Sequence, residues 1–549
     1  MLNSLFLSHR TSAKRPCLAI AVALLTVGDG SAVDYYVRER GIDEANGRTR
    51  NSAWRSIERV NQARLQPGDR VLFEAGKSFT GNLRLTAEDA GDSSAPVVIG
   101  SHGRGRATIR AGVGTGITVE NAGGVTIENL IVAGNGRATN SGYGVVCDNQ
   151  LTTGERLDYL CIQNVEAHGF GRFGIWVTGE RSGFSNVRIL GCVLRDNLRG
   201  GMEVAGRLPY DATNYAHANV LVSRCRAFNN TGDPNRMENH SGSGIVLYQV
   251  DGGVMEFCEA WNNGADCRSP TGGGVGLWTC ASRRVIIQHC ESFANRTSGK
   301  DGGGFDLDGG CVECVLQYNY SHDNDGPGLM VYTYAYASHA DRGNVVRFNI
   351  SENDSRKSRT YAGLWLRSDG PRMTGVEIYN NTVTIGPWCD QTAMVHGHEV
   401  EAAIRNNIFI ARGPAVPLRV SKPHDRIRFE NNLYWHEDGA VQIAWENETF
   451  TSLGEWRQRT GQEQVLGRQT GVNTLPGLTG HSPSVSPGER VGLPQFRAFL
   501  PRPRSPSTVG GMDLRSVFGL DVGARDFSGV PLPDSGGMPL GARVGRSRE

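Results

Sequence analysis

The sequence predicts an all-β protein, a parallel β-helix of about eleven coils, and three observations lead to this fold class. A segment of the form apolar–x–apolar–x–x–Cys/Asn recurs at a period of roughly 25 to 33 residues, the range of solenoid proteins. Within each copy, apolar and often β-branched residues alternate with polar ones, which is the pattern of strands. Glycine is abundant, at 73 of 549 residues, and indicates frequent turns.

Two other repeat architectures fit this period less well. A leucine-rich repeat places Leu at most apolar positions, and a propeller blade needs about 40–45 residues and four strands. In a parallel β-helix, coils stack roughly 4.8 Å apart and point their apolar side chains inward. The copies lie at 125–132, 161–170, 187–197, 220–230, 254–263, 285–295, 314–324, 345–354, 376–383, 403–410 and 427–435.

Both ends of such a stack need a cap, because a terminal coil exposes its interior and an unpaired strand edge. A short amphipathic helix is predicted after Asn51-Ser52, and Ser452-x-x-Glu455 is a capping box that predicts a second helix. Residues 33–470 form the predicted β-helix domain with its cap, and the Pro/Gly-rich residues 471–549 form a covering segment. The N-terminal helix has apolar residues at Trp54, Ile57, Val60 and Ala63.

Residues 1–32 are predicted to be a signal peptide, so we expect a secreted or periplasmic protein. A basic stretch with Arg10, Lys14 and Arg15 precedes the apolar residues 18–27 and a small-residue cleavage site at 30–32. The apolar run is too short to span a bilayer, so we expect no membrane span. The net charge of +1 argues against a nucleic-acid partner. We expect a monomer whose partner is a polysaccharide or oligosaccharide.

Four cysteines occupy the same position in successive repeats, and Asn319 continues the series. We interpret them as a ladder of small, buried and reduced side chains rather than as a metal or redox site. Cys311-x-x-Cys314 is a weak redox signal without a following helix. The sequence does not decide whether Cys267 and Cys280 form a disulfide. The ladder cysteines are Cys192, Cys225, Cys258 and Cys290.

Three stretches and the repeats resemble the right-handed parallel β-helix superfamily, the pectate-lyase-like fold that includes β-helix glycoside hydrolases and polysaccharide lyases. The resemblance covers roughly residues 33–540 and implies a right-handed parallel β-helix with carbohydrate polymers as the usual ligand. It does not fix the reaction. The stretches are DYYVRERGIDEANG, AWRSIERVNQARLQPGDRVLFEAG and DFSGVPLPDSGGMPLGA.

A second series of strands, each near a glycine, lies between the Cys/Asn repeats at 174–178, 201–205, 244–248, 275–279, 304–308, 328–332 and 363–367. Alternation predicts two columns of outward side chains on this face. The first column is Trp176, Glu203, Val246, Gly276, Asp306, Met330 and Trp365, and the second is Thr178, Ala205, Tyr248, Trp278, Asp308, Tyr332 and Arg367.

Asp306 and Asp308 are the predicted catalytic residues. They stand on one face of one strand with their Cα atoms about 6.5–7 Å apart, although Asp is depleted in strands and the pair repels itself. Flanking glycines leave room for a ligand. Glu203 is three coils away, about 14 Å, so a third carboxylate must come from a turn. The candidates are Asp301, Asp323, Asp325 and Glu238.

Aromatic faces and polar side chains near this pair predict a sugar-binding surface. Long inserts at 206–219, 231–243, 264–273 and 333–344 are expected to wall a cleft beside it. His322 is a weaker candidate. The predicted substrate-binding residues are Trp278, Tyr332, Trp365, Arg367, Tyr248, Glu203 and Lys300.

Three functions remain open. The first is a glycoside hydrolase with paired carboxylates; GFDLDGG resembles the catalytic strand of several β-helix hydrolase families, but the following strand, GLMVY, lacks the Glu of the xylosidase-like ones. The second is a polysaccharide lyase, with Lys300, Arg367 or Tyr332 serving in catalysis and the two aspartates holding Ca²⁺. The third is a non-enzymatic carbohydrate-binding surface protein. Apart from Ca²⁺ in a lyase, we expect no cofactor and no metal site.

Overall fold

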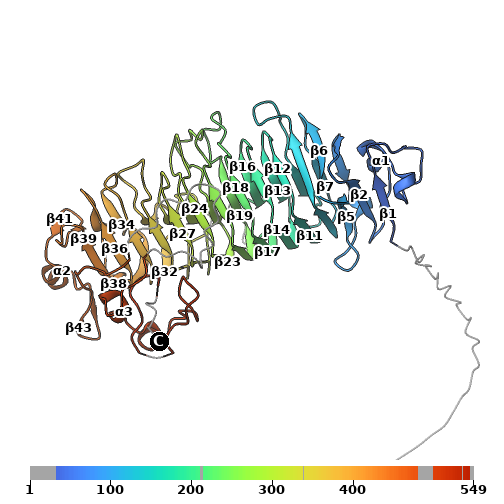
Figure 1. Ribbon diagram of the computed structural model, residues 1–549. Helices are drawn as coiled ribbons and strands as arrows, with labels where there is room; N and C mark the ends of the chain where they lie inside the picture. The colour runs from blue at the N-terminus through green and yellow to red at the C-terminus, as the bar shows by residue number, and fades with distance from the viewer. Residues whose placement is uncertain (1–31, 210–213, 338, 480–498, 535, 544–549) are drawn as a thin grey trace, which may run out of the picture. The chain divides into compact units, whose positions relative to one another are not determined.

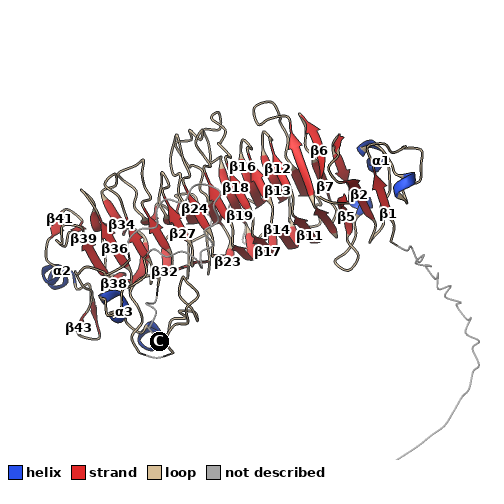
Figure 2. Ribbon diagram, in the orientation of Figure 1, coloured by secondary structure: helices blue, strands red, loops and turns tan. Residues whose placement is uncertain are grey.

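The computed structural model describes residues 32–209, 214–337, 339–479, 499–534 and 536–543. The predicted signal peptide therefore lies outside the described residues, apart from Ala32. The described chain is a right-handed parallel β-helix, and its strands stack as successive rungs while helices lie at the ends and in the C-terminal segment (Figures 1 and 2). Among the described helices, none is long and apolar enough to cross a membrane.

Three parallel sheets, here called A, B and C, form the walls of the β-helix, and each coil contributes one strand to each sheet in that order. Sheet A contains β1 (Asp34–Val37), β2 (Arg70–Glu74), β5 (Val97–His102), β8 (Val125–Glu128), β11 (Leu157–Gln163), β14 (Phe184–Leu190), β17 (His217–Ser223), β20 (Val250–Glu256), β23 (Arg283–Gln288), β26 (Val315–Gln317), β29 (Val345–Arg347), β32 (Met373–Tyr379), β35 (Val400–Arg405) and β38 (Ile427–Glu430).

Sheet B contains β3 (Ser78–Thr80), β6 (Ala107–Gly112), β9 (Leu130–Gly134), β12 (Glu166–His168), β15 (Val193–Arg195), β18 (Arg226–Phe228), β21 (Glu259–Trp261), β24 (Glu291–Phe293), β27 (Tyr320–His322), β30 (Ile350–Glu352), β33 (Thr382–Thr384), β36 (Ile408–Ala411) and β39 (Leu433–His436).

Sheet C contains β4 (Leu83–Leu85), β7 (Ile117–Glu120), β10 (Val145–Asn149), β13 (Phe173–Gly179), β16 (Gly200–Gly206), β19 (Ser243–Tyr248), β22 (Leu277–Cys280), β25 (Phe305–Asp308), β28 (Leu329–Thr333), β31 (Leu364–Ser368), β34 (Gln391–His396), β37 (Val416–Ser421), β40 (Ile443–Trp445) and the antiparallel β41 (Glu448–Phe450).

The described residues form about thirteen coils, two more than the repeat predicted. The additional coils are the first two, β2–β4 and β5–β7. Their turns between sheets A and B carry Ala75-Gly76-Lys77 and Gly103-Arg104-Gly105-Arg106, with no Cys or Asn in either turn. The sequence repeat was recognised by a Cys or Asn at this turn, so the sequence analysis did not detect these two coils.

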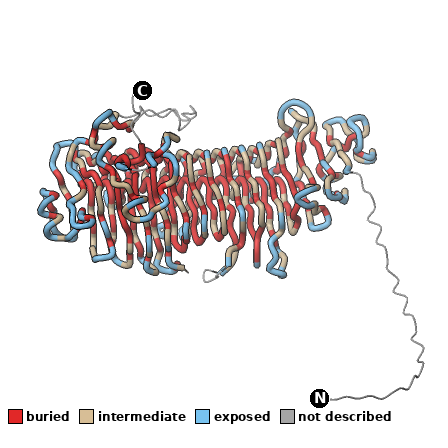
Figure 3. Tube along the Cα trace, turned by 90° about the horizontal axis from the view of Figure 1, so that it is seen from below, coloured by how far each residue is buried: buried red, intermediate tan, exposed pale blue. Residues whose placement is uncertain are grey.

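The interior of the coils is apolar, as the alternation predicted. Figure 3 shows that buried residues follow the stacked coils along the β-helix. Six side chains of sheet C that alternate with the predicted outward columns are fully buried, which removes their apolar surface from water. They are Ile175, Met202, Ile245, Phe305, Leu329 and Leu364.

The cysteine ladder is confirmed at the turns between sheets A and B. The four ladder cysteines are free and at most 1% exposed, and the backbone N–H of Cys290 donates to Asn319 Oδ1 at 3.0 Å. Cys267, Cys280, Cys311 and Cys314 are likewise buried and free, so the Cys267–Cys280 disulfide is absent from the described residues.

A second ladder, of asparagines, follows sheet B and ties successive coils together. Asn263 Nδ2 donates to Ala227 O and to Asn295 Oδ1, both at 3.0 Å, while its Oδ1 accepts from the N–H and Nδ2 of Asn230. Buried amides of this kind stabilise a fold only when every donor and acceptor is paired. The ladder continues through Asn197, Asn230, Asn263, Asn295 and Asn324 and ends at Asp354, which explains why an asparagine follows sheet B in five successive coils.

Both predicted helices are present. α1 (Ile57–Asn61) is capped by Ser56 and buries Ile57 and Val60; it starts later than Asn51-Ser52 because a separate 3₁₀ turn, η1 (Arg50–Ser52), precedes it. α2 (Leu453–Thr460) starts at Ser452, whose hydroxyl accepts from the Glu455 N–H. A 3₁₀ turn η2 (Ala87–Asp89) and a hairpin of β42 (Gln464–Val465) and β43 (Arg468–Gln469) complete these regions.

The C-terminal segment packs against aromatic residues at the turns between sheets A and B. Phe348 and Tyr379 contact apolar residues of the stretch 512–538, which includes α4 (Leu514–Phe518) and follows α3 (Pro506–Val509). Phe348 has a φ of 52°, a conformation that bulky residues rarely adopt. The segment buries Phe348 fully, and the stacked turns hold that conformation.

Candidate active site

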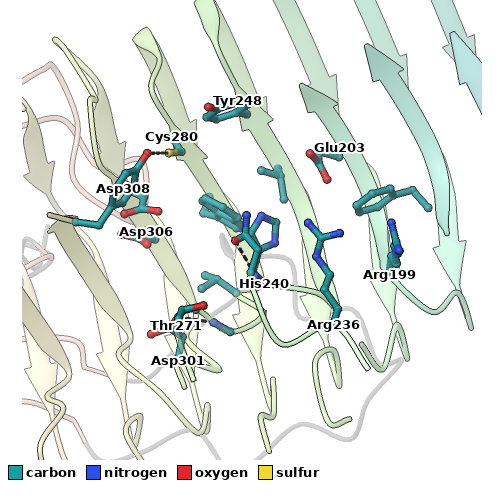
Figure 4. Close-up of a pocket in the computed structure, with 18 of the residues that line it drawn as sticks. Arg199, Glu203, Arg236, His240, Tyr248, Thr271, Cys280, Asp301, Asp306 and Asp308 are labelled. Atoms are coloured by element: carbon teal, nitrogen blue, oxygen red, sulfur yellow. Dashed lines mark hydrogen bonds between the residues drawn. The ribbon is translucent and has the colours of Figure 1, made fainter. Parts of the chain in front are cut away.

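A cleft of about 280 Å³ lies on the outer face of sheet C, over the middle coils (Figure 4). Its floor comes from strands β13, β16, β19, β22, β25 and β28, and turns on both sides form its walls. Three of the four predicted inserts contribute wall residues: 231–243, 264–273 and 333–344. The described residues of the insert 206–219 do not line it, contrary to the prediction.

Asp306 and Asp308 stand side by side on β25 at one end of this cleft (Figure 4). The predicted alignment of the neighbouring strand is wrong by two residues: Trp278 pairs with Asp306, and Cys280 pairs with Asp308. Gly276 lies before β22, in register with Gly304, and a Cβ there would meet Ser292 Oγ at 2.0 Å. On the other side, Asp306 and Asp308 pair with Met330 and Tyr332, as predicted.

Burial dominates the electrostatics of the pair. Asp306 is 2% exposed, and its Oδ1 has no hydrogen-bond partner among the described residues. Burial, followed by the charges of Asp308 and Asp301, raises the pKa of Asp306 well above its usual range. Burial also raises the pKa of Asp308 to about 7, although the Gly309 N–H donates to its Oδ1 at 2.8 Å. Both carboxyls are therefore able to hold a proton near neutral pH.

Asp301 is the turn carboxylate that reaches the cleft. The Tyr361 hydroxyl donates to its Oδ1 at 2.9 Å, and the Gly273 N–H donates to its Oδ2 at 2.6 Å. The other three predicted candidates do not line the cleft. Asp323 forms hydrogen bonds with His322, Asn353 and Arg356. Asp325 accepts hydrogen bonds from Arg296 and from the Thr297 N–H. Glu238 is exposed.

Four of the seven predicted substrate-binding residues line the cleft: Trp278, Tyr332, Tyr248 and Glu203. The other three do not. Trp365 is 8% exposed beneath Tyr332 and Tyr361, with ring centroids 5.4 and 5.2 Å away. Arg367 Nε donates to Asp369 at 2.8 Å, and Lys300 lies in an exposed turn. Alternation along a strand predicts on which face of the sheet a side chain lies, but the neighbouring side chains decide whether that side chain is accessible to solvent.

Several cleft residues were missed by the sequence prediction. Arg236 and His240 come from the insert 231–243, and His240 packs edge-on against Trp278 with ring centroids 4.8 Å apart. Burial, and then the charge of Arg236, lowers the pKa of His240 to about 4, so the ring is neutral at pH 7. Arg172 and Arg199 each stand two residues before a strand glycine, and this repeated position was a signal that could have found them.

The comparisons with known proteins agree with the fold. A family model described as "Right handed beta helix region" matches residues 115–344. A lacto-N-biosidase of Bifidobacterium longum subsp. longum is 25% identical over 477 residues, which cover 69% of this chain. The chain spans only 29% of the length of that curated relative.

Two solved structures are also similar to this chain. One is the GH136 lacto-N-biosidase of Eubacterium ramulus, with 18% identity, a TM-score of 0.49, and coverage of 72% of this chain and 67% of that one. The other is the pectate lyase Pel9A, with 15% identity, a TM-score of 0.45, and coverage of 94% and 97%. At these values neither likeness bears on the reaction.

Proposed function

We propose that this protein is a glycoside hydrolase that binds an oligosaccharide or polysaccharide in the cleft over sheet C. The observation that carries the proposal is the pair Asp306 and Asp308, two carboxyls with raised pKa values on one strand of a cleft. Glycoside hydrolysis needs one carboxyl that is protonated and one that is ionised at the same pH. The likeness to a protein named lacto-N-biosidase supports this class of reaction.

In this mechanism Asp308 is the nucleophile or base. It is the more exposed member of the pair, and its pKa of about 7 lets it ionise in the neutral range. The proton for the leaving group comes from Asp306, whose pKa is higher, or from Asp301, which lines the same end of the cleft. Trp278 and Tyr332 offer apolar surface to the sugar rings beside the pair.

A lyase mechanism with the predicted residues fits this geometry less well. Lys300 does not line the cleft, Arg367 is held by Asp369, and the Tyr332 hydroxyl donates to Asp369 at 3.0 Å. Burial, and then the charge of Asp369, raises the pKa of Tyr332 further above neutrality. A base for β-elimination would therefore have to be another residue.

The test uses the variants Asp301→Asn, Asp306→Asn and Asp308→Asn on an aryl glycoside of lacto-N-biose and on a panel of polysaccharides. An activated leaving group departs without protonation, so the variant of the acid keeps most of its activity on the aryl glycoside and loses it on natural linkages. Asp308→Asn loses activity on both. Unsaturated products would establish a lyase instead, and wild-type rates in all three variants would refute the site.

We also propose that the protein acts outside the cytoplasm, as a monomer and without a metal cofactor. The basic and apolar stretches of residues 1–32 support export. Mass spectrometry of the protein from its native host is expected to find a start near Val33, and an intact Met1 would contradict export. Full activity in a chelator would separate the hydrolase from a Ca²⁺-dependent lyase in which Asp306 and Asp308 hold the ion.

A further inference from the structure

The cleft has two ends of opposite charge. The carboxyls Asp301, Asp306 and Asp308 lie at one end, and Arg172, Arg199 and Arg236 line the other. Figure 4 shows Arg199 and Arg236 near Glu203, away from the aspartates. Since Glu203 on β16 is three coils from β25, the two ends are about 14 Å apart.

The described contacts leave these three guanidinium groups poorly neutralised. Arg172 Nη1 donates to the neutral Tyr143 hydroxyl at 3.0 Å. Arg199 forms an ion pair with Asp233, but the 3.8 Å between Arg199 Nε and Asp233 Oδ2 is too long for a hydrogen bond. Arg236 has a buried Nε without a hydrogen-bond partner among the described residues.

Glu203 does not compensate for this positive charge. No ion pair within 4.0 Å joins Glu203 to an arginine in the described part of the chain. Burial raises the pKa of Glu203 to about 7 even though Arg236 and Arg199 act to lower it. Burial, and then the charges of Arg172 and Arg236, lowers the pKa of Arg199. The cluster therefore brings three like charges together with one ion pair, the 3.8 Å contact of Arg199 with Asp233, which is unfavourable unless a ligand supplies further negative charge.

We propose that Arg172, Arg199 and Arg236 form a subsite for an anionic substituent of the glycan, either a sugar carboxylate or a sulfate ester. Guanidinium groups match such oxyanions in charge and in fork geometry. The inference rests on the proposed function, because the glycan that reaches this subsite also crosses the aspartate end. The distance between the ends requires an oligosaccharide, with its acidic unit away from the bond that is cleaved.

The test measures glycan binding separately from catalysis. Asp308→Asn protein is applied to an array that carries neutral, carboxylate-bearing and sulfate-bearing oligosaccharides. Its signal is compared with that of the same protein carrying Arg199→Gln and Arg236→Gln together. The control adds Arg104→Gln instead, which removes a positive charge from an exposed turn outside the cleft. Melting curves establish that each variant is folded.

The expected result is retention of acidic glycans by the parent and the control, with at least about tenfold weaker binding in the double variant. Whether the retained glycans carry carboxylates or sulfates identifies the source of the anion. Retention of neutral glycans alone, no retention of any glycan, or acidic binding unchanged in the double variant would overturn the subsite. If the subsite is overturned but the wild-type protein hydrolyses neutral glycans, the proposed hydrolase function still holds. If acidic glycans bind at the subsite but the wild-type protein never cleaves them, the hydrolase function is refuted and the subsite is not.

Discussion

Asp308→Asn should lower catalysis and, at the same time, make the protein more stable at alkaline pH. A carboxyl whose pKa is raised on folding binds its proton more tightly in the native state than in the unfolded chain. Below the pKa of the unfolded chain, near pH 4, the Asp308 carboxyl therefore does not change the free energy of unfolding. As the pH rises from there to about 7, ionisation of this carboxyl destabilises the native state progressively. The Asn side chain has the same shape and does not ionise, so this loss disappears.

The magnitude follows from the two pKa values. The difference between 3.8 and about 7 corresponds to about 4 kcal/mol of unfolding free energy above pH 7. This is an upper figure, because Asp308 is half-buried and solvent screens part of the effect. Asp306 will retain some pH dependence, since the charge of Asp308 is only the second cause of its raised pKa.

The assay is a series of melting curves between pH 4 and pH 9, with Asp266→Asn as a control at an exposed carboxyl. The melting temperatures of the wild type and Asp308→Asn should converge near pH 4, and the variant should melt higher at pH 8. Its kcat should fall by at least about a hundredfold. Parallel curves across the whole range would refute the raised pKa, and an unchanged kcat would refute the role.

Three further predictions concern the scaffold. Thiol labelling of the four ladder cysteines should be slow in the native protein and fast after denaturation, and rapid native labelling would contradict the stacking. Asn263→Ala should lower the unfolding free energy by about 3 kcal/mol, because it leaves buried donors unpaired, whereas exposed Asn235→Ala should have little effect in the same melting assay. Burial alone would lower the pKa of His322, but its contacts with Asp323 and Glu291 raise it to about 9. His322→Gln should therefore lower the unfolding free energy by about 3 kcal/mol at pH 6 and progressively less up to pH 10. An equal loss of stability at pH 6 and pH 10 would refute the ion pairs of His322 with Asp323 and Glu291.

The repeat predicted the interior well, because stacking imposes the same requirement on every coil. An inward position of sheet C is apolar in most coils, with the buried Thr279 between Leu247 and Leu307 as an exception. One position between sheets A and B is a small Cys in four successive coils and then an Asn that accepts a hydrogen bond from the preceding coil. The same pattern recurs in many coils of the sequence, so alternation alone identified Ile245 and Phe305 as residues of the interior. The first two coils escaped because their turns use glycine instead of this device.

Local departures from the repeat were harder to predict. The strand β22 starts after Gly276, whose backbone lies against Ser292, and the alternation of outward residues could not reveal that contact. The error moved Trp278 from the side of Asp306 to that of Asp308. Accessibility was hidden for a similar reason, since Trp365 faces outward on its strand and is nevertheless covered by Tyr332 and Tyr361.

The two ends of the cleft differ in how their functional groups are held. Asp306 and Asp308 stand on a strand bonded on both sides, so their spacing is fixed by the sheet and was readable from the sequence. Arg236 comes from the insert 231–243, in a turn and not on a strand of the sheet. If the proposed function holds, a β-helix of this kind can keep the pair Asp306 and Asp308 while its turns change the glycan that binds, since turns tolerate substitution and insertion far better than the stacked strands. For that reason, exchange of the insert 231–243 should alter which glycans bind while leaving the pH dependence set by Asp308 in place.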